Sequence, residues 1–165
     1  MFMEQTNFSL IYIKENFGGF LSPDDVRLFY YDICFEKEVG NTFIYEWSEE
    51  IQSYLSSKNI IIDAIDNNVM PQSFEKNKIY FTMRLSDEGN KAVAFFRHLR
   101  NSFSHYLIGY DGNSFCMKDF VDENMTNQTM IGKIDRQYFY GLIDIFFKQK
   151  AKAEEEYSKY YTPDI

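Results

Sequence analysis

The sequence has few of the residues that mark disulfide-rich or membrane proteins. Its two cysteines, Cys34 and Cys116, lie far apart in apolar surroundings. Such a pair provides neither a disulfide framework nor the ligand spacing of a zinc site. We expect both thiols to act as small core side chains in a reducing cytosol. No apolar run approaches the ~20 residues of a membrane span, and the start, MFMEQTNFSLIYIKENF, lacks the basic region of a signal peptide. We therefore expect a cytoplasmic protein with no membrane partner.

Positive charge is also scarce. The 165 residues carry 17 Lys and Arg against 25 Asp and Glu, which gives a formal net charge of −8. This balance opposes nucleic-acid binding across the whole surface, because the protein and a polyanion repel each other at long range. Residues 84–105 are the exception, since three arginines and Lys91 outweigh Asp87 and Glu88 there. A local anion site is therefore compatible with the composition.

With 45% hydrophobic residues the chain is apolar enough to bury a core. Ser22-Pro23 followed by two acids is a typical helix start. Asp111-Gly112-Asn113 between apolar flanks predicts a hairpin turn. Residues 58–83 predict a loop with one extended stretch, KIYFTM. Apolar spacing predicts helices at about 5–16, 23–39, 42–57 and 86–107, and a last one from Asp135 to before Pro163. We predict one all-α domain over 1–165, a bundle of four or five helices with a small β-hairpin near 108–132.

The predicted helix 86–107 carries the most unusual segment, RHLRNSFSHY from Arg97 to Tyr106, which contains both histidines of the chain. At about 100° per residue, apolar residues such as Phe95 and Leu99 form one stripe that faces the core. The polar residues, both histidines included, lie largely opposite that stripe, so we expect His105 to project away from the core. Asn101 is four residues before His105 and is placed to hold its ring. An ordinary solvated helix face is the alternative interpretation.

The chemistry available to this segment is limited. It has no cysteine nucleophile, no HExxH sequence and no carboxylates at metal-ligand spacing, so we expect no metal and no cofactor. An imidazole that titrates near neutral pH and guanidiniums that match phosphate geometry remain. This set suits metal-independent RNA cleavage, in which a base activates the 2′-hydroxyl, an acid protonates the leaving 5′-oxygen and a cation stabilises the transition state. The products would be 2′,3′-cyclic phosphate ends, and DNA would be inert.

That reaction needs both a base and an acid. His98 lies close to His105 on the helical wheel and is one candidate for the second group. A two-fold dimer that pairs the polar faces of two helices would instead supply two copies of His105. The sequence leaves both arrangements open.

The segment Arg100-Asn101-Ser102-Phe103-Ser104-His105 resembles the R-N-x-x-x-H form of the RxxxxH motif of HEPN domains. The preceding AFFRHL, and the order of a motif helix, a hairpin and a long last helix, are also similar to stand-alone bacterial and plasmid-encoded members. The resemblance is sharpest over residues 86–110. It implies catalytic roles for Arg100 on the scissile phosphate, His105 as general acid or base, and Asn101 in orienting them. Substrate-binding roles for Arg97, His98 and Ser104 are our own inference.

The resemblance also implies a biological setting. Many HEPN proteins are metal-independent endoribonucleases that act as toxins or in antiphage defence, and they form homodimers with a composite active site. Members of one branch pair with an antitoxin protein, so the resemblance also implies a possible antitoxin partner for this chain. Other members are non-catalytic dimerisation modules or bind nucleotides or RNA, and this is our alternative to the ribonuclease. The acidic balance of the chain departs from what broad RNA binding requires.

Overall fold

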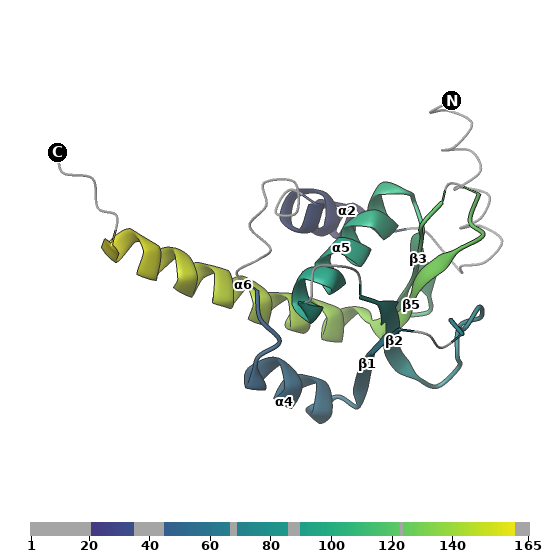
Figure 1. Cartoon of the computed structure of the whole chain (residues 1–165), viewed down its shortest axis with the longest axis horizontal. Helices are drawn as coiled ribbons and strands as arrows, with labels where there is room; N and C mark the ends of the chain where they lie inside the picture. Colours follow the sequence, from purple (N-terminus) through teal and green to yellow (C-terminus); the bar gives the residue numbers. More distant parts are fainter. Residues whose placement is uncertain (1–20, 35–44, 67–68, 86–89, 123, 161–165) are drawn as a thin grey trace.

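The computed structural model describes residues 21–34, 45–66, 69–85, 90–122 and 124–160. They form a five-stranded mixed sheet with helices, so the prediction of an all-α helical bundle is wrong and the chain has an α/β fold (Figure 1). The elements in chain order are α2 (Pro23–Arg27), the π-helix η1 (Leu28–Cys34), α4 (Glu49–Ser57), β1 (Ile60–Ile65), β2 (Ile79–Arg84), α5 (Lys91–Ser104), β3 (Ile108–Asp111), β4 (Ser114–Phe120), β5 (Gln128–Asp135) and α6 (Arg136–Tyr160).

The sheet has the strand order β1-β2-β5-β4-β3. Only β1 and β2 run parallel, with Ile62 opposite Phe81. The pairs β2–β5, β5–β4 and β4–β3 are antiparallel. The central strand β5 is therefore paired on one side with β2, whose residues lie some fifty positions earlier, and this distant partner is what the sequence pattern did not reveal.

Several local predictions are confirmed. The stretch KIYFTM overlaps β2, and β3 and β4 form the hairpin expected around Gly112, which has a positive φ of 61°. The last predicted helix is α6. Ser22 caps α2 by accepting a hydrogen bond from the backbone N–H of Asp25, although the helix continues as η1. The predicted helix 42–57 begins only at Glu49 within the described residues, and the predicted helix 5–16 lies outside them.

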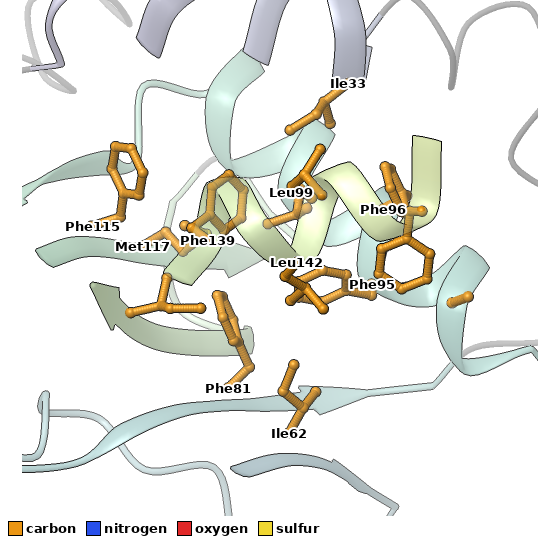
Figure 2. Close-up of a cluster of buried hydrophobic side chains, with 14 of the residues drawn as sticks. Ile33, Ile62, Phe81, Phe95, Phe96, Leu99, Phe115, Met117, Phe139 and Leu142 are labelled. Carbon is orange, nitrogen blue, oxygen red and sulfur yellow. The ribbon is translucent and has the colours of Figure 1, made fainter. Parts of the chain in front are cut away.

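One aromatic core joins the sheet to its helices. Phe95 of α5 lies at its centre, with ring centroids 5.1 Å from Phe81 of β2, 6.3 Å from Phe146 of α6 and 6.0 Å from Trp47. Figure 2 shows Phe81, Phe95 and Leu142 converging from strand and helices. The motif-bearing helix α5 is thus held by rigid packing on the sheet and on α6. Across the described ranges, no helix offers an apolar stretch of the length that a bilayer requires.

Gly132 of β5 is required by the close approach of Phe81 on the neighbouring strand. A Cβ at position 132 would lie 2.1 Å from Cδ1 of that ring, which is itself fully buried. We expect Gly132→Ala to lower the free energy of unfolding by about 1–3 kcal/mol through overpacking. Urea denaturation measures this loss, with the exposed Asp63→Ala on β1 as a control expected to change stability by less than ~0.5 kcal/mol.

Candidate functional site

The candidate residues lie at the C-terminal end of α5, where the chain leaves the helix for the sheet. Ser104 is the last helical residue, and His105 caps the helix with its backbone N–H bonded to the Asn101 carbonyl at 3.0 Å. Tyr106 follows with a positive φ of 58°, which turns the chain toward β3. Ser104, His105 and Tyr106 are all exposed. His105 therefore projects away from the core, as the helical wheel predicts.

His98 does not behave as the wheel predicts. Its side chain is completely buried, so the expectation that both imidazoles lie away from the core is wrong. The reason is that α5 is covered on a second side, where its residues meet β4 and the end of β2. The buried ring places Nδ1 2.8 Å from Oδ2 of Asp119 and Nε2 2.8 Å from the backbone carbonyl of Arg84. Neither ring nitrogen is therefore available to a substrate, and we no longer assign His98 a substrate-binding role.

A carboxylate can only accept, so His98 Nδ1 donates to Asp119 Oδ2 in a contact between two side chains that are at most 1% exposed. Arg97 Nη2 also lies 3.3 Å from Nε2. His98 Nε2 therefore lies between an acceptor, the Arg84 carbonyl, and a donor, the Arg97 guanidinium, and the tautomer of the ring sets which of the two it bonds.

Asp119 of β4 is the residue that the sequence interpretation missed. Its carboxylate is 1% exposed and accepts from His98, from Asn101 Nδ2 at 3.4 Å and from the backbone N–H of Phe120 at 2.9 Å. The sequence did contain a signal for Asp119, because the alternation of side chains along a strand places Phe115, Met117 and Asp119 on the same face of β4. An acid on the core face of a strand requires buried donors, and the His98 side chain is one of them.

Arg100 and Asn101 are both half-buried and are hydrogen-bonded to each other. Arg100 Nη1 donates to Asn101 Oδ1 at 2.9 Å, while the other end of the amide faces Asp119. Asn101 was expected to hold the His105 ring, but its side chain bonds Arg100 and Asp119 instead. The structure thus brings Arg100, Asn101 and Asp119 into one chain of contacts, to which His98 is attached from the core side.

The remaining candidates lie at the edge of this network. Arg97 is half-buried one turn before Asn101, and Ser104 is exposed beside His105. Arg100 and His105 are five residues apart, so the helix separates them by about 7.5 Å along its axis and about 140° around it. The guanidinium of Arg100 and the imidazole of His105 therefore leave a single α5 in different directions.

Exposed aromatic side chains surround this end of α5. Cys34 Sγ of η1 lies 4.0 Å from the Arg100 carbonyl, and the rings of Tyr30 and Phe103 are 6.5 Å apart. The π-helix consequently runs alongside the candidate residues. Tyr30 and Tyr31 are 58% and 63% exposed, and Tyr106 is 42% exposed. We call Tyr30 and Tyr31, whose ring centroids are 5.0 Å apart, together with Tyr106 the exposed aromatic surface.

The two cysteines differ in environment, and within the described residues neither is part of a disulfide. Cys116 is 2% exposed, and burial raises the pKa of its thiol from 9.0 to about 11. Cys34 is half-buried at the end of η1. The expectation of a buried core thiol is therefore confirmed for Cys116 and only partly for Cys34.

A thiol with a raised pKa carries about 100-fold less thiolate near neutral pH, and the thiolate is the reactive form. We expect iodoacetamide at pH 8 to label Cys34 of the folded protein while Cys116 stays unmodified. In denaturant both should react. Mass spectrometry of tryptic peptides measures the two rates, and equal labelling of both cysteines in the folded protein would contradict the burial of Cys116.

Within the part of the chain that the structure describes, no three His, Cys, Asp or Glu side chains are grouped so that they could hold a metal ion. Comparison of the chain with family models, curated proteins and solved structures finds no match. The fold and the site accordingly define an α/β protein with a mixed sheet, whose candidate site is a guanidinium, an amide and an exposed imidazole at the end of α5.

Proposed function

We propose that the chain is a metal-independent endoribonuclease of single-stranded RNA that works as a homodimer. The observation that carries this proposal is the end of α5, where Arg100 is held by an amide and His105 is exposed at the helix cap. A guanidinium suits a phosphodiester, and an exposed imidazole can exchange protons near neutral pH. These are the groups that phosphodiester cleavage next to a 2′-hydroxyl requires.

The reaction is a transesterification. One imidazole accepts the proton of the 2′-hydroxyl, whose oxygen attacks the adjacent phosphorus, and the bond from phosphorus to the 5′-oxygen breaks. A second imidazole, in its protonated form, gives its proton to the leaving 5′-oxygen. Arg100 stabilises the negative charge that builds up on the phosphorane oxygens. The products are a 2′,3′-cyclic phosphate and a 5′-hydroxyl.

A second copy of the chain supplies the second imidazole. His98 is unavailable because both of its nitrogens are bonded in the core, so each protomer offers one surface imidazole, His105. Arg100 and His105 also point to different sides of their own helix, so a cleft that uses both is more readily built from two helices than from one. The exposed aromatic surface next to the motif is where the two protomers would meet in an isologous contact.

The resemblance to HEPN domains supports the proposal through residues 100–105 and through the order of motif helix, hairpin and last helix. The sheet departs from the all-helical plan that the resemblance implied. In this proposal the chain acts in the cytoplasm on cellular or phage RNA, as a toxin or a defence effector. Regulation by an antitoxin would follow from such an activity.

The test is cleavage of 5′-labelled single-stranded RNA in EDTA. We expect fragments that end in a 2′,3′-cyclic phosphate, and no cleavage of DNA or of an RNA with one 2′-deoxy sugar at the cut site. RNA that is bound but left intact would contradict the nuclease and favour the non-catalytic binding module. RNA that is neither bound nor cut by a chain that still dimerises would contradict the nuclease and favour the non-catalytic dimerisation module.

A further inference from the structure

We propose that Asp119 is a positioning residue for the candidate site, which sets the orientation of the Asn101 amide and through it that of Arg100. This inference rests on the proposed function, because the group that is finally positioned is the guanidinium that binds the scissile phosphate. Asp119 comes from β4 and not from the motif helix. The candidate site is therefore shared between α5 and the sheet.

The argument starts from what each atom can do in a hydrogen bond. A carboxylate only accepts, so Asp119 Oδ2 can be bonded by Asn101 only through the amide nitrogen Nδ2. With Nδ2 directed to Asp119, the amide oxygen Oδ1 is the end that faces Arg100, and it accepts from Nη1 at 2.9 Å. The reverse amide orientation would place an N–H group against the guanidinium N–H groups. Asp119 thus selects the one amide orientation that can hold Arg100.

The carboxylate is itself fixed in place. Its Oδ1 accepts from the backbone N–H of Phe120 at 2.9 Å, and its Oδ2 accepts from His98 at 2.8 Å. The register of β4 against β5 is irregular between Asp119 and Phe120, a feature that often re-aims side chains near functional sites. Asp119 therefore has little freedom to follow a movement of Asn101, and Asn101 conforms to it.

The experiment is a double-mutant cycle on kcat for RNA cleavage, with Asp119→Asn, Asn101→Ala and the double variant. Asp119→Asn replaces one acceptor by a group that also donates, so the Asn101 amide can turn over. We expect kcat to fall about 10-fold or more with KM nearly unchanged, and the double variant to be no slower than Asn101→Ala alone. Effects of Asp119→Asn and Asn101→Ala that simply multiply would overturn the proposal.

Ser102→Ala is the matched control. Ser102 is buried, and its Oγ donates to the Lys118 carbonyl at 2.8 Å, so it also joins α5 to β4 but bypasses Asn101. We expect Ser102→Ala to lower stability and leave kcat unchanged. If Asp119→Asn does not fold, the neutral pair His98→Asn with Asp119→Asn takes its place in the cycle, since neither member then leaves a buried charge.

A second readout is independent of catalysis. The side-chain amide protons of Asn101 in 15N-labelled protein should exchange slowly with solvent in the wild type and in Ser102→Ala, and quickly in Asp119→Asn. Unchanged exchange in Asp119→Asn would overturn the positioning role by itself. A wild type that shows the protected amide but cleaves no RNA would instead overturn the proposed function, and with it the catalytic meaning of Asp119.

Discussion

Replacing His105 by alanine is expected to lower the rate of RNA cleavage by about 10²–10⁴-fold, the usual contribution of a general acid or base. The side chain is exposed at the end of α5 and projects away from the core. Its removal should therefore change the free energy of unfolding by less than ~0.5 kcal/mol. Cleavage rates in EDTA, together with urea denaturation and the mass of the particle in solution, measure both effects. Unchanged cleavage by a folded His105→Ala dimer would contradict the assignment.

Arg100→Ala provides the companion measurement. The guanidinium is proposed to stabilise charge on the phosphorane, so its loss should lower kcat more than it weakens RNA binding. Arg97→Ala is the comparison within the same helix, because Arg97 lies outside the proposed chain of contacts from Asp119 through Asn101 to Arg100. We expect it to affect RNA binding more than kcat. The reverse pattern would exchange the roles of the two arginines.

His98→Leu is expected to have the opposite signature, a large loss of stability. The substitution leaves the Asp119 carboxylate buried without the hydrogen-bond donor that faces its Oδ2, and removing the partner of a buried charge typically costs about 3–5 kcal/mol. The pair is 2.8 Å apart and at most 1% exposed. Urea or thermal denaturation measures the loss. His105→Leu is the matched control, which changes the other imidazole of the chain at an exposed position and should leave stability nearly unchanged.

A double substitution separates the contact between His98 and Asp119 from simple packing. When both members of a buried pair are replaced by hydrophobic residues, the exchange is often neutral. We therefore expect His98→Leu combined with Asp119→Leu to recover most of the stability that His98→Leu loses. A double variant that is less stable than either single variant would show that the two side chains stabilise the fold independently of each other.

The local parts of the fold could be predicted from the sequence. The serine-proline start of α2, the amphipathic α5, the turn at Gly112 and the long α6 all depend on residues within one element. The sheet could not be predicted from the sequence, because β2 pairs with β5, whose residues lie about fifty positions later. A stretch such as IIIDAI is apolar enough for a helix or a strand, and only its parallel pairing with β2 decides between them.

The candidate site was predictable to a similar extent. Spacing on a helix correctly places His105 away from the core, since that depends on α5 alone. His98 was misplaced because a wheel with a single core stripe does not include the strand that covers the other side of α5. Asp119 was missed for the same reason, as it reaches the motif from β4. Both errors come from contacts between elements distant in sequence.

The measurement that tests the central claim most directly is cleavage by mixed dimers, made by co-refolding wild type with increasing amounts of His105→Ala. If one cleft needs an imidazole from each protomer, only dimers of two wild-type chains cleave RNA, and the rate falls as the square of the wild-type fraction. A rate that falls in direct proportion to the wild-type fraction would mean that each chain works alone, and it would contradict the shared cleft.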